Sequence, residues 1–189
     1  MSKKIISLTI LAVIVIMVIG ALVFFNKSAN APKLGQSKAS KQHTINTVNA
    51  CDVLTKDIAK QFLKEEPELG SDTASSQSSD DIKVSSCTYS TKFVIGQPSS
   101  LKTISLLVRS PKTQTGFDDN LQGFEDQKLS GDEEVSDYGD KAYWSPQNGQ
   151  LNILKGGNWV IVTAGNITPA SRDLSITKQA VELFKNNIK

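Results

Sequence analysis

Apolar and polar residues are arranged along this chain in blocks that predict a membrane segment, a polar connection and a folded domain. Residues 5–25 form a run of 21 positions without a charged side chain. A helix of this length rises about 30 Å, which matches the hydrocarbon core of a bilayer. We therefore expect a short cytoplasmic tail at 1–4, a transmembrane anchor at 5–25, a flexible stalk at 26–48 and an extracytoplasmic domain at 49–189.

A cleaved secretory signal is the alternative reading of the apolar run. Lys3 and Lys4 give it a positive start, and Ala29-Asn30-Ala31 has the small-x-small form of a cleavage site. Against cleavage, the run exceeds the about 7–15 residues usual for a signal, and Pro32 follows the site directly. Lysines on both flanks leave the orientation of the segment open.

Helical periodicity recurs three times in the rest of the chain. Apolar residues spaced three and four positions apart predict helices from Thr55 to about Glu66, around 117–124 and from about Asp173 to Asn187. Gly116 and Gly123 weaken the second of these by about 1 kcal/mol each.

Strand patterns fill most of the remaining positions. Alternation from Cys87 to Phe93, a turn at 96–98 and an apolar run at 101–108 predict a hairpin, and regular turn clusters after Asp140 predict a meander of three strands. Residues 69–81 are polar and are expected to form a surface loop. The predicted fold class is α+β: an antiparallel sheet of about five strands with packed helices and one disulfide, preceded by a single N-terminal transmembrane helix.

The two cysteines indicate the compartment. Cys51 and Cys87 both lie in the predicted domain, and paired thiols persist in oxidising compartments outside the cytoplasm. A pair of buried free thiols is the alternative. The cysteines favour a cell-membrane protein with a single span and its C-terminal domain outside.

Charge and motifs exclude several functions. Beyond residue 48 the chain has 15 basic and 19 acidic residues, so no basic face for nucleic acid is predicted. His43 is the only histidine and lies in the predicted stalk, which removes a necessary part of histidine-dependent triads and zinc sites. Phosphate-binding and dinucleotide-binding motifs are absent from the sequence. We expect no enzyme activity, no catalytic residue and no cofactor.

One acidic segment and one aromatic set are candidate binding features. Five carboxylates fall within nine positions, and oxygen clusters in loops suit hard cations or a basic partner; a solvated loop is the alternative. They are Asp132, Glu133, Glu134, Asp137 and Asp140. Tyr143, Trp144 and Trp159 can form an aromatic platform, although core packing is the favoured interpretation.

Two stretches resemble a known family. Cys51-Asp52-Val53-Leu54-Thr55 with Cys87-Thr88-Tyr89, and Gly139-Asp140-Lys141-Ala142, are similar to segments of uncharacterised cell-envelope lipoprotein domains of Gram-positive bacteria, especially actinobacteria. The resemblance implies a Cys51–Cys87 disulfide and covers about residues 49–188. The chain departs from the family pattern at its anchor, because no lipidated cysteine follows the apolar run.

These observations lead to one functional expectation with two alternatives. We expect a membrane-anchored, sensor-like or binding domain of the cell envelope, attached through residues 5–25, with a small ligand or an envelope protein as partner. A structural or accessory subunit of an envelope complex is the first alternative. A hydrolase that depends on carboxylates or on an unaided serine is the second.

Overall fold

The computed structural model describes residues 43–74, 78–96 and 101–188. The chain divides into two compact units, 1–41 and 42–189, and all described residues belong to the second. The predicted tail, the anchor at 5–25 and most of the predicted stalk therefore lie outside the described residues. Within the described ranges, no helix combines the length and the apolar character that crossing a bilayer requires.

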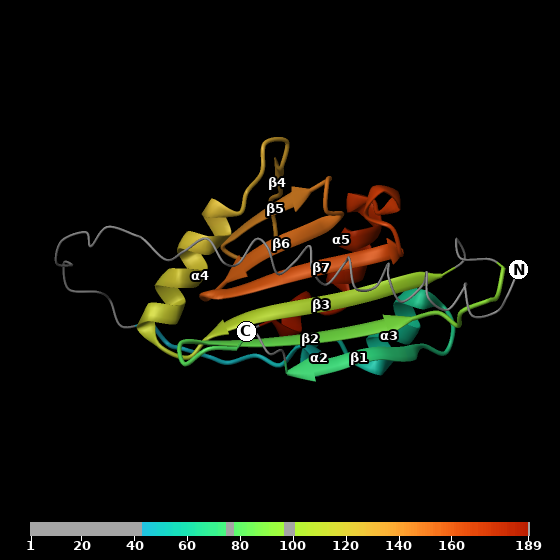
Figure 1. Cartoon of the computed structure of the whole chain (residues 1–189), viewed down its shortest axis with the longest axis horizontal. Helices are drawn as coiled ribbons and strands as arrows, with labels where there is room; N and C mark the ends of the chain where they lie inside the picture. Colours follow the sequence, from blue (N-terminus) through green and yellow to red (C-terminus); the bar gives the residue numbers. More distant parts are fainter. Residues whose placement is uncertain (1–42, 75–77, 97–100, 189) are drawn as a thin grey trace, which may run out of the picture. The chain divides into compact units, whose positions relative to one another are not determined.

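One antiparallel sheet organises the described residues (Figure 1). The strands follow the spatial order β1-β2-β3-β7-β6-β5-β4. Their bounds are Glu68–Ala74 for β1, Ile82–Ser90 for β2, Lys102–Pro111 for β3, Glu133–Glu134 for β4, Lys141–Ser145 for β5, Gln150–Lys155 for β6 and Asn158–Asn166 for β7.

The predicted fold class is wrong in its sheet: the described residues form seven strands rather than about five. The hairpin is present as β2 and β3, and the meander as β5, β6 and β7. The two additional strands are the edges of the sheet. Most of β1 falls in the segment 69–81 that was predicted to be a loop, and it pairs with β2 from Glu68↔Ser90 to Ala74↔Ser85. The other edge, β4, is two residues long.

Three helices cover one face of the sheet. They are α2 at Ala50–Val53, α3 at Lys56–Leu63 and α5 at Leu174–Glu182, and short 3₁₀ turns at Pro169–Ser171 and Lys185–Asn187 precede and follow α5. The Thr55 hydroxyl caps α3, and the Asp173 carboxylate caps α5, as expected for residues that satisfy free amides at a helix start. Their apolar sides pack on the sheet residues Leu106, Val160 and Val162, which form the main core.

The fourth helix lies on the opposite face. α4 spans Gln114–Asp126 and crosses one end of the sheet (Figure 1). Phe124 packs there with Tyr143, Leu154 and Trp159 in a second, smaller core. Asn120 is fully buried, and its amide donates to the carbonyls of Arg109 and Gly157 at 2.8 and 2.9 Å. This side chain therefore ties α4 to β3 and to the β6–β7 turn.

The chain enters the described part at the α4 end. The His43 ring stacks on Phe117 of α4 with 4.2 Å between ring centroids. Val48 is buried, and its N–H donates to the Ser110 hydroxyl at 2.8 Å. Residues 43–48, which the sequence analysis placed in the stalk, thus contact the domain.

A disulfide joins Cys51, in α2, to Cys87, in β2. The predicted bridge is therefore confirmed. It connects the first helix of the domain to a strand 36 positions further on, and Cys87 has no exposed surface. The bond is consequently part of the main core.

Candidate functional site

A groove of about 500 Å³ lies between the end of α4 and the β4–β5 edge. α4 ends at Asp126, and the chain then returns to β4, which pairs with β5 through Glu133↔Trp144 and Glu134↔Tyr143. This connection brings the last turn of the helix beside the sheet edge. The residues that matter for its chemistry are Phe124, Glu125, Lys128, Glu134, Lys141 and Tyr143.

The floor of the groove is aromatic and buried. Phe124 and Tyr143 are only 2% and 3% exposed, and their rings meet edge to face with 4.9 Å between centroids. Trp159 supports Phe124 from below at 6.0 Å. Edge-to-face contacts of this kind fix ring orientation as well as excluding water, so the floor is rigid.

Burial also determines the ionisation of the tyrosine. It raises the pKa of Tyr143, and the nearby carboxylates of Asp132 and Glu125 act in the same direction. The phenol is therefore neutral at physiological pH. The Lys128 ammonium lies 6.0 Å from the centroid of this ring, where a cation is attracted to the aromatic face.

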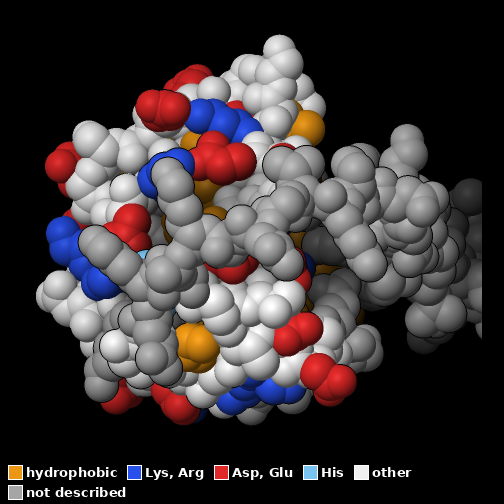
Figure 2. Space-filling model, turned by 90° about the vertical axis from the view of Figure 1, so that its left-hand side faces the viewer, with side chains coloured by type: hydrophobic (Ala, Val, Ile, Leu, Met, Phe, Trp, Pro, Cys, Tyr) orange, Lys and Arg blue, Asp and Glu red, His pale blue; other side chains and the backbone are white. Residues whose placement is uncertain are grey.

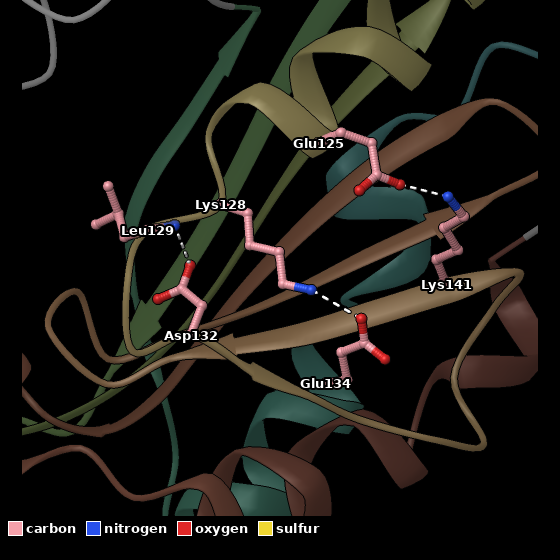
Figure 3. A network of polar contacts seen from close by, with 6 residues as sticks. All are labelled: Glu125, Lys128, Leu129, Asp132, Glu134 and Lys141. Atoms are coloured by element: carbon pink, nitrogen blue, oxygen red, sulfur yellow. Dashed lines mark hydrogen bonds and ion pairs between the residues drawn. The ribbon is translucent and has the colours of Figure 1, made fainter.

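Two ion pairs form the walls (Figure 3). Lys128 Nζ lies 2.9 Å from Glu134 Oε1, and Lys141 pairs with Glu125. The hydrogen bond from Lys128 lowers the pKa of Glu134. The groove thus presents two ammonium groups and two carboxylates over an apolar floor.

A smaller pocket of about 250 Å³ lies between Tyr138 and the C-terminal residues. The Tyr138 hydroxyl donates to Glu182 Oε1 at 3.1 Å, and burial together with this bond raises the pKa of Tyr138 to about 12. Lys185 Nζ also contacts Glu182, at 2.6 Å. Two lining residues of this pocket, Tyr138 and Lys185, are thus both engaged by Glu182.

The five predicted acidic residues do not converge on one point. Asp132 accepts from the Leu129 N–H at 2.9 Å, as Figure 3 shows, and Glu134 belongs to the groove wall. Asp137 accepts from the Ser136 hydroxyl at 3.0 Å, Asp140 accepts from the Gly156 N–H at 2.8 Å, and Glu133 is exposed on β4. In the ranges that the structure describes, no three potential ligands gather in a metal-binding arrangement.

The three aromatic residues lie on two faces of the sheet. Trp144 belongs to the main core, whereas Tyr143 and Trp159 belong to the second core. The Trp159 indole N–H donates to Asn152 Oδ1 at 3.1 Å in a buried bond. These side chains are core residues and form no shared platform.

Sequence reasoning did not find the groove as a site. Glu125, Lys128 and Lys141 carry no motif, and the sequence separates them by up to 16 positions. The only local signal in the sequence is the end of the helical pattern near Asp126. It indicates that Lys128 and the acidic residues after it lie beyond a helix end, but not which residues they meet.

Comparisons with known proteins gave no match: no family model fits the chain, and no curated protein or solved structure matches it.

Proposed function

We propose that the chain is an extracytoplasmic binding domain, held at a membrane by residues 5–25, and that the groove beside α4 takes a small ligand with one positive and one negative group. The observation that carries this proposal is the groove itself. A volume of about 500 Å³ with a few oriented polar groups over an apolar floor is typical of small-molecule sites.

The buried disulfide supports the location. The Cys51–Cys87 bond lies in the main core, and core disulfides of this kind belong to proteins that fold in oxidising compartments. The uncharged run at 5–25 supplies the attachment that such a domain needs to stay at the cell surface.

The ion pairs on the groove walls favour a dipolar ligand. The side chains of Lys141 and Glu125 are 61% and 49% exposed, and exposed ion pairs contribute only about 0–1 kcal/mol. A ligand ammonium can therefore replace Lys141 at Glu125, and a ligand carboxylate can replace Glu134 at Lys128, at little cost. A dipolar ligand frees Lys141 and Glu134 together, and these two opposite charges already attract each other, whereas a ligand with a single charge would free only one of them.

Binding of free amino acids and dipeptides to the purified full chain in detergent tests the proposal. We expect amide chemical-shift changes confined to 124–143 and an affinity that falls about tenfold, or about 1.4 kcal/mol, in Glu125→Gln, which removes the carboxylate that the ligand ammonium would contact. Glu66→Gln is the matched control, because Glu66 forms a similarly exposed ion pair with Lys56 outside the groove. Equal effects of the two substitutions, or shifts outside the groove, would contradict the proposal.

A further inference from the structure

Exposed apolar side chains gather at one end of the sheet. Among the described residues eight large hydrophobic side chains are exposed, and Leu121 and Leu129 lie in α4 or just after it. The other six belong to the opposite end of the strands: Leu69, Phe93, Val94, Ile95, Ile167 and Ile176.

Strand pairing places five of these residues at one end, and Ile176 of α5 lies there too, next to Gly165 near the end of β7. Leu69 lies opposite Tyr89 near the end of β2, and the N–H of Thr91 donates to the Lys102 carbonyl at 3.0 Å where the β2–β3 loop closes. Lys102 in turn lies opposite Asn166 at the end of β7, so Ile167 follows at the same edge. We call this surface the apolar end. The other end of the domain has acidic and basic described side chains interspersed, with only small hydrophobic areas visible (Figure 2).

The outermost part of the apolar end is three consecutive residues of the β2–β3 loop. Phe93, Val94 and Ile95 are 51%, 46% and 90% exposed. Each of these side chains leaves about half or more of its surface uncovered in the described domain. Such a segment is usually covered by another protein, by a ligand or by lipid.

The charge around the loop favours lipid. Lys92 and Lys102 flank the three apolar residues and are exposed, and the whole hairpin from Ile82 to Pro111 contains no Asp or Glu. Outside the hairpin, Glu65 accepts from the Lys92 N–H at 3.1 Å, and Glu68 lies opposite Ser90 on β1. Apolar side chains flanked by lysines suit the interface of an anionic bilayer, where the apolar part inserts and the ammonium groups stay at the headgroups.

We infer that the apolar end docks on the surface of an anionic bilayer through Phe93, Val94 and Ile95. The inference rests on the proposed membrane attachment, which keeps a bilayer within reach. The chain enters the described part at the far end of the sheet, where His43 stacks on Phe117. Residues 26–42 can extend to at most about 60 Å, and the ten residues of β3 span about 33 Å. The connection is therefore long enough for the apolar end to face the membrane.

Tryptophan fluorescence in proteoliposomes tests this docking. The full chain with Ile95→Trp is reconstituted into vesicles of phosphatidylcholine and phosphatidylglycerol, with and without brominated acyl chains, and the wild-type signal is subtracted. The new indole should emit at shorter wavelength and lose intensity about twofold in brominated vesicles, because interfacial side chains insert about 5–10 Å. Leu121→Trp is the matched control, since Leu121 is exposed on α4 at the other end, and its emission should not respond to bromine.

Each other outcome overturns the inference for a separable reason. Equal bromine quenching of the two variants would mean that the apolar end has no preferential contact with lipid, and a blue shift of Ile95→Trp without quenching would mean that a protein surface or a second copy covers it. Flotation of the vesicles after an alkaline wash reports the anchor independently. A chain that floats without quenching of Ile95→Trp overturns the docking alone, whereas a chain that does not float overturns the attachment and the docking with it.

Discussion

Gly116 and Gly123 show how one residue type serves two different purposes within α4. A Cβ at Gly116 would lie 2.0 Å from the Asp81 carbonyl oxygen, whereas a Cβ at Gly123 would meet only Trp159 Cζ3 at 3.4 Å. Sequence reasoning treated both as weaknesses of the helix. The structure shows that Gly116 is required for the helix to approach the β1–β2 connection and that Gly123 has room for a methyl group.

Alanine at these two positions should therefore change stability in opposite directions. Gly116→Ala is expected to lower the free energy of unfolding by about 1–3 kcal/mol, because the clash is with backbone. Gly123→Ala should raise it by up to about 1 kcal/mol, since alanine favours helix. Denaturant titrations of both variants measure these changes. An equal loss of unfolding free energy at both positions would contradict the distinct roles given to Gly116 and Gly123.

Tyr138 should make stability depend on pH in the alkaline range. Burial and the bond to Glu182 raise its pKa from 10.0 to about 12, so the folded protein keeps a proton that the unfolded chain releases. The stabilising contribution is complete below pH 10 and is lost as pH rises towards 12. Tyr138→Phe has no proton to lose, so the stability difference between wild type and variant should shrink over this interval. Urea midpoints measured at several pH values check this, and parallel curves for the two proteins would contradict it.

At the scale of elements, the disulfide is the connection between α2 and the sheet. Closing a loop with a sequence separation of 36 removes conformational freedom from the unfolded chain, which corresponds to about 4 kcal/mol in the chain-entropy model. Replacing both cysteines with alanine should lower the free energy of unfolding by about this amount, and reduction of the wild-type protein should reproduce the loss. A change below about 1 kcal/mol in both experiments would mean that the bridge adds little to the core.

The elements that sequence predicted are those with a strong internal pattern. The helices found as α3, α4 and α5 have apolar residues at helical spacing, and β2, β3 and the β5–β7 meander have alternation and turn residues. Edge strands lack such a pattern: β1 is polar and pairs on one side only, and β4 is two residues long. The alternation also predicted that the strand continues to Phe93, which is wrong. Phe93 keeps the period of β2 but lies beyond the end of that strand at Ser90.

The groove was unpredictable for a different reason. Phe124 meets Tyr143 in its floor, and Glu125 meets Lys141 in its walls. Both pairs form only because the chain returns from α4 through β4 to β5. Composition drew attention to the acidic residues 132–140 instead. Of these, Glu134 and Asp140 do line the groove, while Asp132 and Asp137 make local contacts and Glu133 is exposed.

The whole molecule presents three features that function must accommodate: a core disulfide, a charged groove beside α4 and an apolar end on the opposite side. A domain outside the cytoplasm accounts for the disulfide, a dipolar ligand accounts for the groove, and a nearby bilayer accounts for the apolar end. All three explanations assume the same location for the domain. The disulfide, the proposed ligand site and the proposed lipid contact would all belong to a domain at the cell surface.

Labelling of intact cells that express the chain, with a membrane-impermeant amine reagent followed by peptide mapping, tests this location most directly. Lys112, just before α4, and Lys141, on the groove wall, are exposed away from the apolar end, whereas Lys3 and Lys4 lie in the predicted cytoplasmic tail and serve as internal controls. We predict that Lys112 and Lys141 are acylated in intact cells and that Lys3 and Lys4 are acylated only after lysis. Protection of Lys112 and Lys141 until lysis would place the domain inside the cell and contradict this prediction.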